Sequence, residues 1–362
     1  MIVVDSHEDI AWNCLTFGRD CTLPSAVTRA REAGSAAPTH NGQELLGWAD
    51  WLLGRVAVVF ATLFVAPLRH QLGPWETLCY ADSNEAHRLY RLELDFYHRL
   101  VDDHPEKFRL VCTTGDLEAV LAGWESQDLQ DRQVGLVLLM EGADGLRQPA
   151  ELGEWFESGL RVLGPAWAAT RYAGGTKEPG PLTNEGRLLL DVMADLGMIL
   201  DLSHMAEAGI LEALDRYSGP IIASHSNSLA LLAGCPFPER QMTDLAIHRL
   251  VEREGVIGIV PYNRFLRAGW DLPDGRQGIT LDHVTAHIDH VCQLAGDARH
   301  VGLGSDFDGG FGLEALPLGL DSIADLRFIG DALMARGYSP PDVEAVLGGN
   351  WLSLLRRALP ET

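Results

Sequence analysis

The chain has 362 residues, 46% of them hydrophobic, and its 28 Lys and Arg against 51 Asp and Glu leave a formal net charge of −23. This composition is typical of a globular protein, and the negative charge argues against nucleic acid or an anionic membrane as a partner. The longest apolar stretch, residues 56–67, falls short of the roughly 20 residues of a spanning helix. With no signal-like N-terminus and six cysteines without a Cys-x-x-Cys pair, we expect a cytoplasmic protein with reduced thiols.

The first nine residues predict a buried strand that ends in two potential metal ligands. The apolar residues 1–4 lead directly into His7 and Asp9. Because side chains alternate along a strand, these two side chains leave the same face at the strand's end. An imidazole beside a carboxylate forms half of a metal site, so His7 and Asp9 are candidate ligands.

Four further short apolar runs also end in residues that can bind metal. They finish at Glu141, His204, His225 and Asp306. In a barrel of parallel strands the carboxyl ends meet at one rim, so all of these side chains would converge there. His204 and His225 are separated by the length of one helix-plus-strand repeat, which predicts that they lie on neighbouring strands.

The segments between these runs predict alternating helices and strands. Helices are expected at 43–53, 77–103, 115–121, 155–163, 184–196, 206–214 and 282–294, with closing helices between 321 and 360, and further strands at 56–65, 108–112, 161–167 and 256–262. Thr183 is the expected N-cap of the helix at 184–196, Gly197 is its expected end, and residues 173–181 form a loop rich in Gly and Pro. The alternation predicts an α/β fold, a single (β/α)8 TIM barrel over residues 1–362. Nine candidate strands compete for eight places, and the short strand at 108–112 is the one we expect outside the barrel.

Some of the candidate site residues could have a purely structural role instead of a functional one. Glu141 could pair with an Arg or cap a helix, and Arg240 could be solvated or cap a helix instead of holding a substrate carboxylate through two hydrogen bonds. His283, His287 and His290 share one helical face, but no strand delivers them to the rim. We therefore interpret these three histidines as structural.

The ordered motifs resemble those of the membrane (renal-type) dipeptidases, a branch of the amidohydrolase superfamily of metal-dependent barrels. The matching segments run in family order across almost the whole chain and are 5–9, 141–142, 201–204, 224–226 and 304–309, supported by 287–290 and 350–352. The resemblance implies two Zn²⁺ per chain bridged by Glu141. It implies that one Zn²⁺ is also held by His7 and Asp9, and the other by His204 and His225. Two further implied roles are proton exchange between Asp306 and a metal-bridging hydroxide, and capture of the substrate carboxylate by Arg240.

One position departs from the family pattern. Family members have a His that binds the substrate oxyanion at the strand end where this chain has Trp167. Loss of such a donor typically lowers the rate by about 10²–10³, unless the indole N–H, Arg171 or Tyr172 takes over its role. We expect Trp167 to line the substrate site together with Tyr262, which follows another strand.

The sequence therefore favours zinc-dependent hydrolysis of a small amide bond by a metal-bridging hydroxide. The favoured substrate is a dipeptide with a free C-terminal carboxylate. Two alternatives stay open: hydrolysis of another small amide, an N-acyl amino acid, a lactam or a lactone on the same two metals, or a catalytically silent metal-binding homologue. We expect a small-molecule partner, no nucleic acid and no membrane, and a homodimer is compatible with the sequence.

Overall fold

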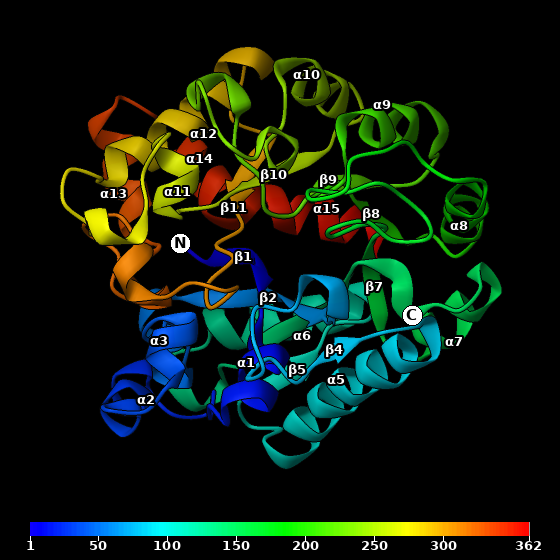
Figure 1. Ribbon diagram of the computed structural model, residues 1–362. Helices are drawn as coiled ribbons and strands as arrows, with labels where there is room; N and C mark the ends of the chain where they lie inside the picture. Colours follow the sequence, from blue (N-terminus) through cyan, green and yellow to red (C-terminus); the bar gives the residue numbers. More distant parts are fainter. Residues whose placement is uncertain (362) are drawn as a thin grey trace.

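The computed structural model describes residues 1–361 and contains a closed ring of eight parallel strands (Figure 1). Going around the ring, each strand pairs with the next one along the chain, and the last strand pairs with the first. The eight strands are β1 (Val3–Glu8), β2 (Val56–Phe64), β6 (Val134–Glu141), β7 (Leu160–Gly164), β8 (Ile199–Asp201), β9 (Ile221–Ala223), β10 (Val256–Ile259) and β11 (Val301–Leu303). The predicted (β/α)8 TIM barrel is confirmed.

A further strand, β5 (Phe108–Leu110), pairs with β6 but is not part of the ring. It pairs with residues 134–136 at the start of β6, whereas β7 pairs with residues 138–141 further along. The other edge of β6 pairs with β2 and closes the barrel. The prediction that the short strand near Phe108 lies outside the barrel is therefore confirmed. Two very short strands, β3 (Ala66–Pro67) and β4 (Cys79–Tyr80), follow β2 in the chain and pair with each other outside the barrel sheet.

Helices surround the ring, with α8, α9 and α10 following one another along one side and the long α5 on another (Figure 1). Their bounds are α1 (Ile10–Phe17), α2 (Ser25–Glu32), α3 (Ala37–Asn41), α4 (Trp48–Gly54), α5 (Ser83–Asp103), α6 (Thr114–Glu125), α7 (Leu152–Glu157), α8 (Asn184–Asp195), α9 (Glu207–Arg216), α10 (Asp244–Glu252), α11 (Asn263–Leu266), α12 (Leu281–Ala295), α13 (Phe328–Ala335), α14 (Pro340–Glu344) and α15 (Asn350–Ala358). Among residues 1–361, no helix combines the length and the apolar character needed to cross a bilayer.

Capping residues explain where α5 begins and where α8 begins and ends. The Thr183 side chain accepts the N–H of Gly186 at the start of α8, and Gly197 follows its end with φ 69°, as predicted. The helix expected from residue 77 begins instead at Ser83, because the Asp82 side chain caps it by accepting two backbone N–H groups.

Two other predicted helices have different bounds. The helix expected at 155–163 ends at Glu157, because Gly159 turns the chain with φ 102° and residues 160–164 form β7. Trp167 consequently lies in the loop after β7, and not at the end of the strand. The helix expected at 43–53 begins at Trp48, since the N–H groups of Leu45 and Leu46 donate to the Asp308 carboxylate instead of to a helix.

The hydrophobic core fills the barrel and the space between strands and helices. Every residue of β1, β2 and β6 is buried, as expected of parallel strands covered on both faces. Trp351 of α15 packs against Phe60 with ring centres 5.5 Å apart, and its indole N–H donates to the carbonyl of Leu303 at 3.0 Å. Polar side chains gather instead at the carboxyl ends of the strands.

Candidate active site

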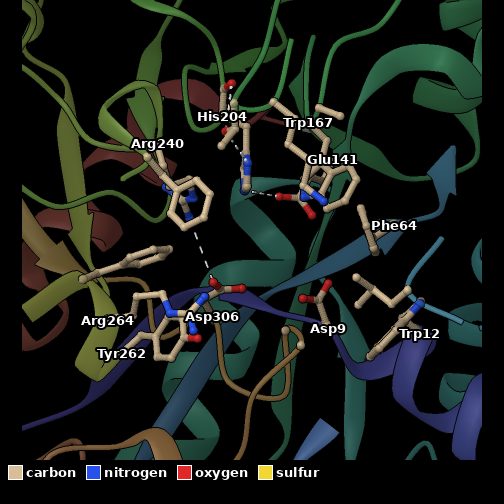
Figure 2. A pocket seen from close by; sticks show the side chains of 18 of the residues that line it. Asp9, Trp12, Phe64, Glu141, Trp167, His204, Arg240, Tyr262, Arg264 and Asp306 are labelled. Atoms are coloured by element: carbon tan, nitrogen blue, oxygen red, sulfur yellow. Dashed lines mark hydrogen bonds and ion pairs between the residues drawn. The ribbon is translucent and has the colours of Figure 1, made fainter. Parts of the chain in front are cut away.

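Glu141, at the end of β6, lies close to three histidines, His204 (Figure 2), His225 and His7. Its Oε1 is 2.9 Å from Nε2 of His204 and 3.3 Å from Nε2 of His225. Its Oε2 is 3.8 Å from Nε2 of His7. One oxygen of the Glu141 carboxylate therefore faces His204 and His225, and the other faces His7.

Two aspartates complete the cluster on the side of His7. Nε2 of His7 is 3.9 Å from a carboxylate oxygen of Asp9 and 3.9 Å from a carboxylate oxygen of Asp306. Asp306 is held close to β1 because its backbone N–H donates to the carbonyl of His7 at 3.1 Å. The structure thus brings together all six residues that the sequence analysis placed at the rim, while their individual roles stay predictions.

The chemistry of these donors fits bound metal ions. Both ring nitrogens of His7 and Oδ1 of Asp9 are buried and have no hydrogen-bond partner within residues 1–361. Two sets of three ligand atoms lie within 4.8 Å of one another, one from His7, Glu141 and His225 and the other from His7, Asp9 and Asp306. Imidazole nitrogen and carboxylate oxygen together suit divalent cations such as Zn²⁺. Because buried polar atoms normally have partners, the orphaned atoms indicate a place for a cation.

Burial also sets the protonation of the cluster in a way that suits cations. It lowers the pKa of His7, His204 and His225 well below the usual value, so these imidazoles are neutral and can offer a lone pair. Burial and neighbouring carboxylates raise the pKa of Asp9 and Glu141 well above the usual value. Carboxylates in such a place are stabilised by positive charge, so the electrostatics agree with the donor set.

Two hydroxyl groups orient the histidines that follow β8 and β9, and sequence reasoning missed both roles. Oγ1 of Thr176 lies 3.0 Å from Nδ1 of His204, a residue that adopts the left-handed conformation with φ 66°. Oγ of Ser224 lies 2.7 Å from Nδ1 of His225 and donates to Oδ2 of Asp201 at 2.5 Å. Asp201 and Ser224 fall within the motifs 201–204 and 224–226, whereas nothing in the local sequence marked Thr176.

Asp306 has a pKa suited to proton transfer near neutrality. Burial raises the pKa of this carboxyl to about 7, against the lowering effect of the nearby Arg240 guanidinium. Oδ2 of Asp306 is 4.0 Å from Nη2 of Arg240. An acid with a pKa close to the working pH is the most effective general acid and base.

A cavity of about 240 Å³ opens onto the cluster, with Arg240 on one side and Trp167 on the other (Figure 2). The Arg240 side chain is buried, and its Nη1 donates to the carbonyl of His225 at 2.8 Å. Its Nη2 is buried without a hydrogen-bond partner in the described part of the chain. Tyr262 lines the same side and stacks on Phe311 with ring centres 4.1 Å apart. Arg240 therefore presents free donors to the cavity.

The opposite side of the cavity is aromatic. The Trp167 ring packs against Phe64 with centres 5.0 Å apart, and Phe64 in turn meets Trp12 at 6.4 Å. Arg171 and Tyr172, which the sequence analysis considered as substitute donors, do not line the cavity. The Tyr172 hydroxyl donates to the carbonyl of Leu146, and Arg171 pairs with Glu185 at 3.3 Å.

The three histidines of α12 have structural partners and lie outside the cluster. His287 is buried and its Nδ1 accepts the N–H of Ser228 at 3.2 Å, while His290 pairs with Asp244 at 2.8 Å. Nδ1 of His283 accepts the N–H of Thr280 at the start of the helix. These contacts agree with the structural interpretation of the three residues.

A (β/α)8 barrel whose carboxyl rim collects histidines and acidic residues is the arrangement of a metal-dependent hydrolase. Comparison with known families narrows this class. The family described as membrane dipeptidase (peptidase family M19) matches residues 1–360. The chain belongs to this family, and it is a hydrolase of the metallo-dipeptidase class.

Individual relatives agree with this assignment. An uncharacterized protein in the pqqA 5' region of Klebsiella pneumoniae is 31% identical over 276 residues, which cover 73% of this chain and 94% of that protein. The dipeptidase ataJ of Aspergillus terreus is 30% identical over 285 residues, covering 73% of this chain and 66% of that protein. A metallo peptidase from Rhodobacter sphaeroides has the same fold, with a TM-score of 0.76 at 23% identity and 99% of both chains covered.

Proposed function

We propose that the chain binds two Zn²⁺ and hydrolyses dipeptides that carry a free C-terminal carboxylate. The observation that carries this proposal is the position of Glu141, whose Oε1 faces His204 and His225 while its Oε2 faces His7. A carboxylate placed in this way can hold one cation with each oxygen. Asp9 and His7 would complete one site, and His204 and His225 would complete the other.

Bound divalent cations would supply an activated water at neutral pH and would polarise the scissile carbonyl. The residues around them have separate tasks. The free Nη2 of Arg240 is suited to bind the substrate's terminal carboxylate, which orients the peptide across the cavity. The Rhodobacter sphaeroides relative was crystallised with a phosphinate mimic of the dipeptide L-Ala-D-Ala, which supports a small peptide as the substrate class.

Asp306 is the group proposed to move the proton. Its Oδ1 and Oδ2 lie between His7 and Arg240, so the carboxyl group can take a proton from the attacking water and hand it to the departing amine. A pKa raised by burial to about 7 makes both directions of transfer accessible. Trp167 lines the cavity opposite Arg240, where its indole N–H is the donor that could take the place of the family His at a substrate oxygen.

Metal analysis of the purified protein, together with a panel of L,L and L,D dipeptides, N-acyl amino acids and lactams, tests the proposal. We expect two zinc ions per chain and turnover of dipeptides. Asp306→Asn should abolish turnover and retain both metals, while Asp191→Asn, a surface control whose partner is Arg216, should behave as the unmodified protein. Full activity of Asp306→Asn, or exclusive turnover of lactams or N-acyl amino acids, would contradict the proposal.

A further inference from the structure

A lysine lines the active-site cavity beside Trp167. The chain has only two lysines, Lys107 and Lys177, among its 28 basic residues, and Lys177 is the one that lines the cavity. Its Nζ is 4.6 Å from the centre of the Trp167 ring, within the range of a cation–π contact. Figure 2 shows Trp167 and Arg240 on opposite sides of His204 and Glu141. Arg264 also lines the cavity but pairs with Asp271, so Lys177 is the cation that lines the cavity beside Trp167.

The ammonium group of Lys177 has no ion-pair partner within 4.0 Å in the described residues. Its neighbour in sequence, Glu178, is already occupied by Arg69 and His70, each at 2.6 Å. Glu76 also lines the cavity, but its Oε2 accepts the backbone N–H of Leu72 at 2.6 Å, and burial raises the pKa of its carboxyl group. Glu76 is thus the carboxylate of the cavity that interacts with Lys177, and it does so without a direct ion pair, so the ammonium group is open to a closer carboxylate partner.

Partial burial makes this charge receptive to an anion. Burial lowers the pKa of Lys177, which means that its ammonium form is less well solvated than that of a free lysine. A carboxylate brought next to it would restore that stabilisation and would be shielded from water by the aromatic wall of Trp167, Phe64 and Trp12.

We propose that Lys177 recognises an acidic side chain on the N-terminal residue of the substrate. This inference rests on the proposed function, in which Arg240 holds the C-terminal carboxylate and the metals lie at the scissile carbonyl. In that orientation the residue before the scissile bond lies on the Trp167 side, and its side chain extends toward Lys177. The preferred substrates would be dipeptides that begin with Glu or Asp.

The test compares peptides of the same shape with and without the charge. We expect kcat/KM of the zinc-loaded enzyme to be about five- to tenfold higher for L-Glu-L-Ala than for L-Gln-L-Ala, the range of one partly shielded ion pair. Lys177→Met should bring this ratio close to one, and Lys177→Arg should keep most of it because the charge remains. Lys107→Met is the matched control, since Lys107 lies outside the cavity beside Glu106, and it should keep the ratio of the unmodified enzyme.

A binding measurement gives a second readout that does not depend on turnover. With both lysines labelled by reductive methylation with ¹³C, L-Glu-L-Ala added to the zinc-loaded Asp306→Asn variant should shift the Lys177 signal and leave the Lys107 signal in place. L-Gln-L-Ala should shift it less.

The outcomes separate the two proposals. If the enzyme hydrolyses both peptides and Lys177→Met lowers both rates by the same factor, the role of Lys177 is refuted and the dipeptidase proposal stands. If the enzyme hydrolyses and binds neither peptide nor any other dipeptide, both proposals fail.

Discussion

Removing the Ser224 hydroxyl tests whether its hydrogen bond to Nδ1 of His225 orients the imidazole as a metal ligand. In the structure, Oγ of Ser224 lies 2.7 Å from Nδ1 of His225 and donates to Oδ2 of Asp201 at 2.5 Å. Because the Ser224 hydroxyl donates its own proton to Asp201, it can only accept from His225, which places the imidazole proton on Nδ1. Nε2 of His225, 3.3 Å from Glu141, is then free to bind a cation. Ser224→Ala would leave a buried N–H without a partner and the ring free to turn.

The expected magnitude follows from this loss. Removing a group that orients a metal-binding histidine weakens metal affinity by about 10–100-fold. At about 1.36 kcal/mol per tenfold change, this equals roughly 1.4–2.7 kcal/mol, which agrees with the penalty of about 1–3 kcal/mol for a buried unsatisfied donor. The affinity for the zinc ion at the site assigned to His204 and His225 should fall by this factor, measured by competition with a fluorescent chelator.

Ser228 provides a matched control in the same segment. Its hydroxyl is also buried but has no hydrogen-bond partner, so Ser228→Ala removes a serine hydroxyl without breaking a contact. We expect this variant to bind zinc as the unmodified protein does. Equal zinc affinity in Ser224→Ala and Ser228→Ala, with both variants folded by circular dichroism, would refute the idea that Ser224 orients His225.

Two further predictions concern stability. Arg19 is buried with Glu32 at 2.9 Å, Glu44 at 2.5 Å and Asp308 at 3.7 Å, so Arg19→Met should lower the free energy of unfolding in urea by about 3–5 kcal/mol. Arg299→Met breaks only the exposed pair with Asp297 and should leave the urea midpoint close to that of the unmodified protein; similar losses for both variants would contradict this. Chelating the metals should destabilise the protein more at pH 8 than at pH 5. The pKa of Asp9, Glu141 and Asp306 is raised in the metal-free fold, to about 7 for Asp306. The stability of the metal-free fold that depends on protonation of these carboxyl groups is therefore fully present below their unfolded pKa near 4 and is lost as the pH rises through the folded pKa. A difference in Tm between loaded and chelated protein that shrinks from pH 5 to pH 8 would contradict this reasoning.

The convergence of the six polar residues could be predicted because two simple regularities apply to them. Side chains alternate along a strand, and the carboxyl ends of parallel barrel strands share one rim, so a His, Asp or Glu after each buried run has one place to go. The same logic excluded the histidines of α12, which the structure places outside the cluster with partners of their own. By contrast, the start of β7 depends on the turn at Gly159, and the late start of α4 depends on the distant Asp308, which no local pattern reveals.

The sequence predicts a loop at residues 173–181, but the way this loop folds decides where Thr176 and Lys177 lie, so their positions could not be predicted. The N–H of Thr176 donates to the carbonyl of Trp167 at 2.9 Å, and the N–H of Lys177 donates to the carbonyl of Ala168 at 3.2 Å, so the loop folds back on its own beginning. This fold needs Gly175, because a Cβ there would lie 2.3 Å from the carbonyl oxygen of Trp167. The glycine that marks the segment as a loop is thus also what places Lys177 over the Trp167 ring. The tryptophan that departs from the family pattern and the lysine facing the cavity are parts of one folded unit, and for that reason their effects on substrate choice should be measured together.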